Sequence, residues 1–412
     1  MGKKGPLVVI SLGLWLLVAP MSFGYHPSSM WMNDMLCGFL LICLGFFAMQ
    51  TAKKWLIKGA AFIGFWLQLA PLIFWAPEAA SYMNDTLVGM ALMLLAFSLP
   101  GLCDEEKGEE NPAGWSFNPS ALGPRGVTVF LALIAWFLAR YLASYQLGYI
   151  DEIKDPFFGD GTLKVISSSV AKMFPVSDAG LGAFGYSLEC LLGLIGSSRR
   201  WKTMPWVSVF FGMMVIPAGM VSILLIVLQP VLVGAWCGIC LLIAVCMLVM
   251  ILLTIPELAA TAQLLLKARK NRNFWSVFWH GDLSLPAPVV SPIQRNCISE
   301  LGFTIPWNLV LTALLGVWLM CSPYLLENAH PAADTNYIAG PLLVAISIIS
   351  FSEVIRSLRF VNVLIALGLI VSSFVFSGFS SLGWVNNLIV GVLIAVFSFP
   401  KGKRKERYGE SK

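Results

Sequence analysis

Long runs of apolar residues recur along the whole chain and decide what it can fold into. Hydrophobic residues make up 58% of the 412 positions and charged residues only 12%, whereas a soluble domain carries about 25% charged residues. A helix of about 20 apolar residues spans a bilayer and satisfies its own backbone hydrogen bonds there. The sequence therefore predicts an all-α polytopic membrane protein with about 12 transmembrane helices. We expect these spans at residues 6–25, 33–50, 55–75, 84–100, 126–147, 180–197, 205–228, 236–256, 306–326, 337–355, 360–378 and 384–400.

The basic residues predict how these spans are oriented, because short cytoplasmic loops retain Lys and Arg. With a cytoplasmic N-terminus, all but four of the 27 basic residues fall on the cytoplasmic side. The exceptions are Arg140, Lys154, Lys164 and Lys172. We therefore expect an inner (plasma) membrane protein with both termini in the cytoplasm and Cys237 at the outer face. The net charge of +5 then reflects orientation and not nucleic-acid binding. No small-x-small cleavage site follows the first apolar run, so we expect a retained span there.

A repeated unit occupies both ends of the chain, residues 1–100 and 306–400. Three copies, which begin at Gly13, Gly64 and Gly316, have Gly-x-Trp, then a small residue and Pro, then Asn or Asp, then Gly. A fourth copy begins at Gly368 and lacks both Trp and Pro. Pro and Asn or Asp suit the ends of two helices, and Gly lets those helices approach closely. The pattern resembles the SPW repeat family of bacterial membrane proteins, which implies two helical hairpins at each end. We interpret Trp15, Trp66 and Trp318 as packing or interface anchors.

Three hydrophilic segments separate or follow these regions. Residues 101–124 are acidic and contain Pro and Gly, which is typical of a flexible cytoplasmic linker. Residues 257–305 form a second linker, in which basic and aromatic residues predict an amphipathic segment on the anionic inner leaflet. Residues 401–412 form a basic tail. Residues 125–256 remain as a central core of four spans.

Cys237 and Cys240 stand three residues apart at the start of the last core span, so they share one face of a helix N-terminus. The partial positive charge there stabilises a thiolate and makes a cysteine a better nucleophile. A redox pair is one interpretation of this motif. The alternatives are half of a metal site, or two cysteines that simply pack in an apolar helix.

The layout of residues 125–256 adds to this motif. Four spans, a long outer loop after the first, and Cys-x-x-Cys at the outer start of the fourth resemble the vitamin K epoxide reductase family. In that family a four-helix bundle encloses a quinone beside such a pair. The supporting segments are residues 165–168, 174–183, 186–193 and 236–241. The resemblance implies that Cys237, partly exposed, exchanges with a partner thiol or disulfide. It also implies that Cys240, one turn deeper, passes electrons to the quinone.

The chain departs from the family pattern in the outer loop. Family members that relay electrons internally carry two further cysteines there, whereas residues 149–177 contain none. Thr162 stands about where the nearer loop cysteine would fall, and Ala244 replaces a tyrosine expected four residues after Cys240. We therefore expect partners to reach Cys237 directly.

Four further residues are candidate quinone contacts: Asp178, Ser168, Glu189 and Trp236. Asp178 stands where animal members of the family place a quinone-bonding asparagine, and Trp236 directly precedes the cysteine pair. Ser168 either hydrogen-bonds a quinone or caps the helix that enters the membrane. Glu189 lies inside a span, where an ionisable group is costly. It either lines the quinone pocket or pairs with Arg140.

These features predict a membrane thiol–disulfide oxidoreductase that couples Cys237 and Cys240 to a quinone of the ubiquinone or menaquinone type. The expected partners are membrane lipid, the quinone and an extracytoplasmic thiol–disulfide carrier protein. We expect no bound metal and no nucleotide, because the sequence has no ligand cluster and no Gly-rich phosphate loop. The alternative is a non-catalytic scaffold or transporter-like protein that kept the bundle after losing the relay.

Overall fold

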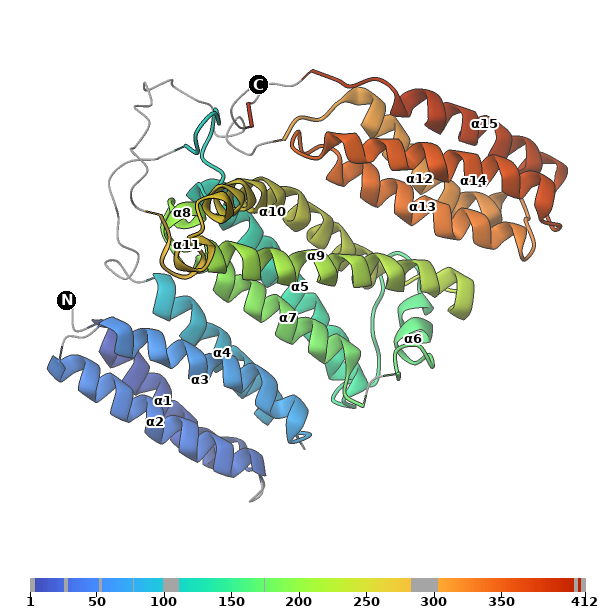
Figure 1. The fold of residues 1–412 in the computed structure, drawn as a ribbon. Coiled ribbons are helices and arrows are strands. Elements are labelled where there is room, and N and C mark those ends of the chain that lie inside the picture. The colour runs from blue at the N-terminus through green and yellow to red at the C-terminus, as the bar shows by residue number, and fades with distance from the viewer. Residues whose placement is uncertain are drawn as a thin grey trace. The chain divides into compact units, whose positions relative to one another are not determined.

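The computed structural model describes residues 4–25, 29–51, 54–76, 78–98, 111–173, 175–282, 303–403 and 407–408. These residues form helices joined by turns and loops (Figure 1). The long helices are α1 (Lys4–Phe23), α2 (Ser29–Thr51), α3 (Lys54–Ile73), α4 (Ala79–Ser98), α5 (Leu122–Gln146), α7 (Asp178–Leu194), α9 (Pro205–Leu228), α10 (Gly238–Lys270), α12 (Trp307–Leu325), α13 (Ala332–Ile349), α14 (Val361–Val375) and α15 (Ser381–Ser398). The short ones are α6 (Gly161–Ile166), α8 (Arg200–Thr203), α11 (Phe274–His280), the π-helix η1 (Gln229–Val233) and the 3-10 helix η3 (Arg356–Phe360).

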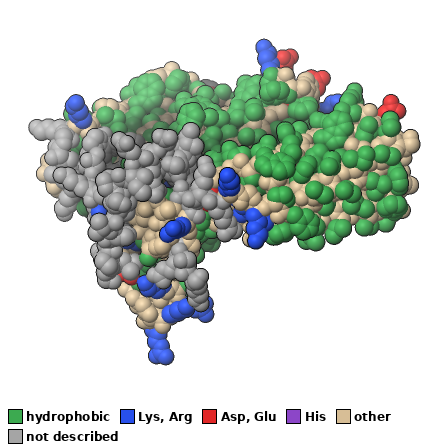
Figure 2. All heavy atoms as spheres, turned by 90° about the horizontal axis from the view of Figure 1, so that it is seen from above, with side chains coloured by type: hydrophobic (Ala, Val, Ile, Leu, Met, Phe, Trp, Pro, Cys, Tyr) green, Lys and Arg blue, Asp and Glu red, His purple; other side chains and the backbone are tan. Residues whose placement is uncertain are grey.

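A helix lies at every predicted span, so the all-α polytopic fold is confirmed. Within the described ranges, 11 helical segments are long and apolar enough to cross a bilayer. The remaining predicted span corresponds to α7, which has 17 residues and is therefore about 25 Å long. Figure 2 shows hydrophobic side chains over much of the face that it draws, with Lys and Arg standing out singly. Such a surface suits contact with lipid.

Helix α10 is longer than the predicted span, because it continues past Pro256 to Lys270. Glu257, which follows Pro256, is 3% exposed and pairs with Arg200. Arg200 Nε lies 2.5 Å from Glu257 Oε1, and Arg200 Nη2 lies 2.7 Å from Glu257 Oε2. Ser120 and Ser208 also donate to Oε1, at 2.7 and 3.0 Å. These bonds fasten α10 to neighbouring segments at the point where we expected the linker 257–305 to begin, and they satisfy a carboxylate that would be costly to bury alone. Most of that linker, residues 283–302, and residues 99–110 of the acidic linker lie outside the described residues.

Contacts within the chain divide it into two compact units. The first comprises residues 1–107, 132–154 and 166–197, and the second comprises residues 108–131, 155–165 and 198–412. The predicted core of residues 125–256 contributes to both. Helix α7 and most of α5 belong to the first unit, whereas α9 and α10 belong to the second.

In the first unit, the predicted repeat glycines lie where the two helices of a hairpin cross. A Cβ on Gly13 would lie 2.8 Å from the carbonyl oxygen of Gly38, and a Cβ on Gly64 would lie 2.6 Å from that of Gly89. A carbon atom cannot approach an oxygen so closely without displacing the backbone. Hairpins α1–α2 and α3–α4 therefore depend on glycine for their close packing.

Tryptophan side chains join the two hairpins of the first unit to each other. Trp15 donates its indole N–H to Asn84 (2.8 Å), and Trp66 donates to Asn33 (2.7 Å). Each hairpin thus supplies the tryptophan for the asparagine of the other. These tryptophans are anchors, as predicted, but they act through hydrogen bonds between hairpins.

The C-terminal hairpins α12–α13 and α14–α15, in the second unit, make this bond once instead of twice. Trp318 donates to Asn386 at 2.8 Å. At the positions of the second pair the chain has Ile370 and Thr335. The second pair therefore lacks both the tryptophan and its asparagine partner.

The residue that follows each repeat asparagine differs in charge between the two ends of the chain. In the first unit it is Asp34 or Asp85, both 0% exposed. In the second unit, Asn336 and Asn387 hold the same positions and bond each other reciprocally, at 3.0 and 2.7 Å. The same framework thus accepts either acidic or neutral side chains at its centre.

Candidate redox site at the start of α10

Cys237 and Cys240 form a disulfide at the N-terminus of α10, with their Cα atoms 5.2 Å apart. Cys237 is the residue that caps the helix, and its sulfur accepts a hydrogen bond from the backbone amide of Cys240 at 3.1 Å. The position predicted from the apolar run is therefore confirmed. The preceding turn ends at Gly234, whose φ of 70° is left-handed and which lets η1 stop just before the pair.

The exposure of the two cysteines differs from the expectation. Cys237, predicted to be partly exposed, is 0% exposed, whereas Cys240 is partly exposed. The loop of residues 155–161 packs on the residues that flank Cys237. A Cβ on Gly161 would lie 2.2 Å from the carbonyl oxygen of Trp236, so the two backbones are in direct contact.

Asp155 fixes this loop on the start of α10. Its Oδ2 accepts a hydrogen bond from the backbone amide of Gly238, between the two cysteines, at 2.9 Å. Its Oδ1 accepts from the amides of Phe157 and Phe158, at 2.8 and 3.2 Å. Partial burial tends to raise the pKa of Asp155, but the hydrogen bonds from Thr162 and these amides outweigh it and lower the pKa. Asp155 is therefore an anion placed at a helix N-terminus.

Thr162, at the position expected for a relay cysteine, serves this contact instead. Its hydroxyl donates to Asp155 Oδ2 at 2.6 Å, and the residue is 0% exposed. A second buried acceptor, Oε1 of Gln229, takes the hydrogen bond of the Cys237 amide at 3.0 Å. Asp155 and Gln229 were not among the residues predicted from the sequence. The signal for Asp155 was an acidic residue in the loop between α5 and α6, seven positions before Thr162.

Asp178, predicted as a quinone contact, is the first residue of α7 and is engaged by Gln146 at the end of α5. Gln146 Nε2 lies 2.5 Å from Asp178 Oδ1, and Ser177 Oγ lies 2.5 Å from Gln146 Oε1. Ser177 also caps α7, accepting from the amide of Gly180 at 2.9 Å.

The helix cap that we considered for Ser168 is therefore made by Ser177. Ser168 accepts a bond from the Ala171 amide at 3.4 Å, within a turn before α7.

Arg140 and Glu189, offered as a possible ion pair, do not pair. The Arg140 guanidinium lies over the rings of Trp136 (4.4 Å) and Tyr82 (5.5 Å), and its Nη2 is 3.0 Å from the sulfur of Met83. Cation–π contacts with Trp136, four residues earlier on the same helix, and with Tyr82 therefore stabilise this guanidinium in place of a carboxylate. Glu189 is 2% exposed, and its Oε2 has no hydrogen-bond partner.

The predicted site residues fall into two groups. Trp236, Cys237 and Cys240 lie together in the second unit, whereas Ser168, Asp178 and Glu189 belong to the first. Among the residues that the structure describes, no group of three or more His, Cys, Asp or Glu side chains could hold a metal ion.

Two family models match this chain. The vitamin K epoxide reductase family model matches residues 127–255, and the SPW repeat domain model matches residues 5–98 and 306–400. Both resemblances expected from the sequence are thereby confirmed. No curated protein and no solved structure matches the chain significantly.

Proposed function

We propose that this chain passes electrons from partner thiols to a membrane quinone, because the vitamin K epoxide reductase family model matches its residues 127–255, between two segments that match the SPW repeat model. The observation that carries the proposal is the Cys237–Cys240 disulfide at the start of an apolar helix inside the matched segment. The family match supports a membrane oxidoreductase. The disulfide supplies a group that can accept two electrons.

The proposed reaction has two halves. A partner thiolate attacks one sulfur of the disulfide and forms a mixed disulfide, and the other chain cysteine leaves as a thiolate. The second thiol of the partner then resolves the mixed disulfide, which leaves the partner oxidised and Cys237 and Cys240 reduced. When the two cysteines form their disulfide again, they give up two electrons and two protons, which convert a quinone to the quinol.

Burial of Cys237 adds a requirement to the first half. Because Cys237 is 0% exposed, an attacking thiol can reach it only after the loop of residues 155–161 has withdrawn. The hydrogen bonds of Asp155 to Gly238 and to Thr162 are the contacts that have to break. We propose that a partner protein displaces this loop, in place of the missing cysteine relay.

Trapping a partner tests the proposal. In Cys240→Ser, the Cys237 thiolate can attack the disulfide of an oxidised partner, but Cys240 is not there to displace the partner again, so a mixed disulfide between Cys237 and the partner should accumulate. Cys237→Ser should abolish quinone-coupled thiol oxidation. Cys246→Ser is the matched control, because Cys246 is a free, buried cysteine on the same helix, and this variant should retain activity. If neither Cys237→Ser nor Cys240→Ser changes thiol oxidation or quinone reduction by the purified protein, the catalytic proposal is wrong.

The second candidate function is a non-catalytic membrane scaffold. The observations in its favour are the burial of Cys237 and the threonine at the relay position. In a scaffold the disulfide would be structural. Reducing it should then lower the melting temperature, and the protein should oxidise no thiols in an activity assay. An oxidoreductase should cycle between both states while folded.

We also propose an inner-membrane location with both termini in the cytoplasm and Cys237 outside. A thiol reagent that cannot cross the membrane should then label Cys237 in intact cells after reduction. It should spare Cys103 and Cys297, which lie outside the described residues. Labelling of Cys103 with protection of Cys237 would reverse the orientation.

A further inference from the structure

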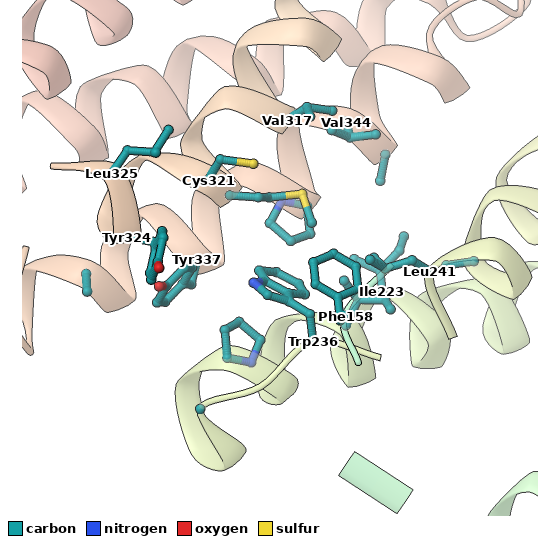
Figure 3. Close-up of a pocket in the computed structure, with 18 of the residues that line it drawn as sticks. Phe158, Ile223, Trp236, Leu241, Val317, Cys321, Tyr324, Leu325, Tyr337 and Val344 are labelled. Carbon is teal, nitrogen blue, oxygen red and sulfur yellow. The ribbon is translucent and has the colours of Figure 1, made fainter. Parts of the chain in front are cut away.

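The second unit contains a cavity of about 960 Å³ between the segment that carries Cys237 and Cys240 and the C-terminal repeat helices α12 and α13 (Figure 3). Phe158, Trp236 and Leu241 contribute to one wall, and Cys321, Tyr337 and Val344 contribute to the other. Figure 3 shows these two groups of side chains facing each other across the cavity. We call this cavity the side chamber. Its volume lies within the range of small-molecule sites, about 300–1,000 Å³.

The lining of the side chamber favours an uncharged ligand. No Lys, Arg, Asp or Glu belongs to it among the described residues. His330 is its one titratable nitrogen base, and this residue already faces Asp334, with Nδ1 2.8 Å from Oδ1. A phospholipid headgroup would therefore find no Lys or Arg for its phosphate, whereas a neutral ring with an apolar tail has no charge to desolvate.

The aromatic side chains of the chamber suit a flat ring. The rings of Trp236 and Tyr337 meet edge to face, with centroids 5.9 Å apart and planes at 79°, and such aromatic surfaces pack well against another ring. Asn328, on the loop between α12 and α13, also contributes to the lining, and its Oδ1 accepts a bond from the Ser380 amide at 3.2 Å.

The chamber adjoins the disulfide through the chain itself. Trp236 directly precedes Cys237 and Leu241 directly follows Cys240, and both line the cavity. Ala244, one turn further along α10, lines it too. The family resemblance leads one to expect a tyrosine at Ala244, and a tyrosine ring there would fill part of the space. The small side chain keeps the chamber open beside the helix turn that carries Cys240.

We propose that the side chamber binds a membrane quinone, with its ring beside Trp236 and Tyr337 and its isoprenoid tail against the aliphatic wall. The identity of the ligand rests on the proposed function. In this arrangement the two electrons and two protons of the Cys237 and Cys240 dithiol pass to the ring, which leaves a disulfide and a quinol. The C-terminal repeat then has a definite role, because α12 and α13 form half of the quinone site.

Cys321 offers a direct measurement, because it is a free thiol in the chamber wall. The protein would be placed in phosphatidylcholine nanodiscs and treated with a membrane-permeable maleimide. A short-tailed ubiquinone analogue, at about ten times its Kd, should slow the alkylation of Cys321 roughly tenfold, because labelling follows the unoccupied fraction. Cys43, a free thiol in the first unit, should be alkylated at an unchanged rate. Extra phosphatidylcholine in place of the analogue should protect neither thiol.

Blocking the chamber supplies a second measurement. Val344→Trp places a large ring in the cavity, whereas Val392→Trp places the same ring on α15 at a residue that is 54% exposed and does not line the chamber. Val344→Trp should lose the protection of Cys321 by quinone and raise the KM for quinone about tenfold or more, while Val392→Trp should change neither.

Failure of this inference is distinguishable from failure of the proposed function. If wild-type protein reduces quinone but quinone leaves Cys321 unprotected and Val344→Trp leaves KM unchanged, the quinone binds elsewhere and the inference is wrong. If quinone protects Cys321 in the wild type and in the Cys237→Ser/Cys240→Ser variant, yet no thiol oxidation occurs, the chamber is a quinone site in a protein with another function. Equal protection by phosphatidylcholine would make it a lipid site and overturn the inference.

Discussion

The carboxylate of Asp155 accepts the backbone amide of Gly238 at 2.9 Å, at the helix position between the two cysteines. An anion at a helix N-terminus stabilises the helix, but it also opposes the partial positive charge that favours a thiolate there. Asp155 therefore stabilises the oxidised state relative to a reduced state that contains a thiolate.

Asp155→Asn tests this effect of charge. The amide oxygen can still accept the bond, but the negative charge is gone, so the thiolate becomes easier to form and the disulfide easier to reduce. We expect the reduction potential to rise by about 6–20 mV, since a helix-terminus charge is worth about 0.3–1 kcal/mol and 30 mV corresponds to about 1.4 kcal/mol. Redox titration with glutathione buffers measures it. A lower potential in Asp155→Asn would contradict this role.

The loop contact should also depend on pH. Because hydrogen bonds lower the pKa of Asp155 in the folded protein, the contact contributes stability above the ordinary pKa, near 4, and loses it as the pH falls through the folded value. Exchange of the Gly238 amide with deuterium, corrected for its intrinsic rate, should be slow and constant from about pH 5 to 8 and faster below about pH 4. Asp155→Asn should abolish this pH dependence.

Thr162→Val should loosen the loop over Cys237. Valine matches the shape of threonine but cannot donate to Asp155, so the loop loses one of the bonds that hold it. After reduction, Cys237 should react with a maleimide several-fold faster than in the wild type, whereas Thr162→Ser, which keeps the hydroxyl, should stay close to the wild-type rate. An unchanged rate in Thr162→Val would show that this hydroxyl does not control access.

Glu189→Gln tests the sequence-based alternative that the quinone binds beside Glu189 and takes a proton from its carboxyl. Since Glu189 has no ion pair with Arg140 to lose, the variant should stay folded with an undiminished melting temperature. Because neither Glu189 nor Asp178 lines the side chamber, quinone reduction by Glu189→Gln and by Asp178→Asn should keep the wild-type rate and pH dependence. A slowing of about tenfold or more in Glu189→Gln, as for the loss of a general acid, would place the quinone beside Glu189 and contradict the side chamber.

The Asp34→Asn/Asp85→Asn variant should fold. The reciprocal Asn336–Asn387 pair shows that the repeat framework accepts two amides at these positions. We expect its melting temperature to stay within about 1–2 °C of the wild type, which corresponds to about 1 kcal/mol for a chain of this size. Asp34→Leu/Asp85→Leu leaves Asn33 and Tyr25 without their acceptors and should melt much lower. Equal melting temperatures for the two double variants would show that these hydrogen bonds contribute little.

The sequence was sufficient for features that repeat or that depend on long apolar runs. Span positions follow from hydropathy, and the paired glycines and the helix-capping cysteine follow from spacing. Residues brought together by a loop folding back were not predictable in this way. Asp155, in the loop between α5 and α6, meets Gly238 on α10, and Arg200 meets Glu257 from another helix. The proposed Arg140–Glu189 pair was wrong because Trp136, four residues from Arg140 on the same helix, offered a nearer partner.

The exchange of tryptophans between hairpins has a consequence for how the protein is made. When residues up to about 50 have left the ribosome, the indole N–H of Trp15 lacks its acceptor Asn84, and Asn33 Oδ1 lacks the indole donor of Trp66, because neither of these partners has been inserted yet. A single hairpin is therefore an incomplete insertion product. The biosynthetic unit at either end of this chain is a set of four helices, and a truncation after the first hairpin leaves polar groups that the translocon or a chaperone has to shelter.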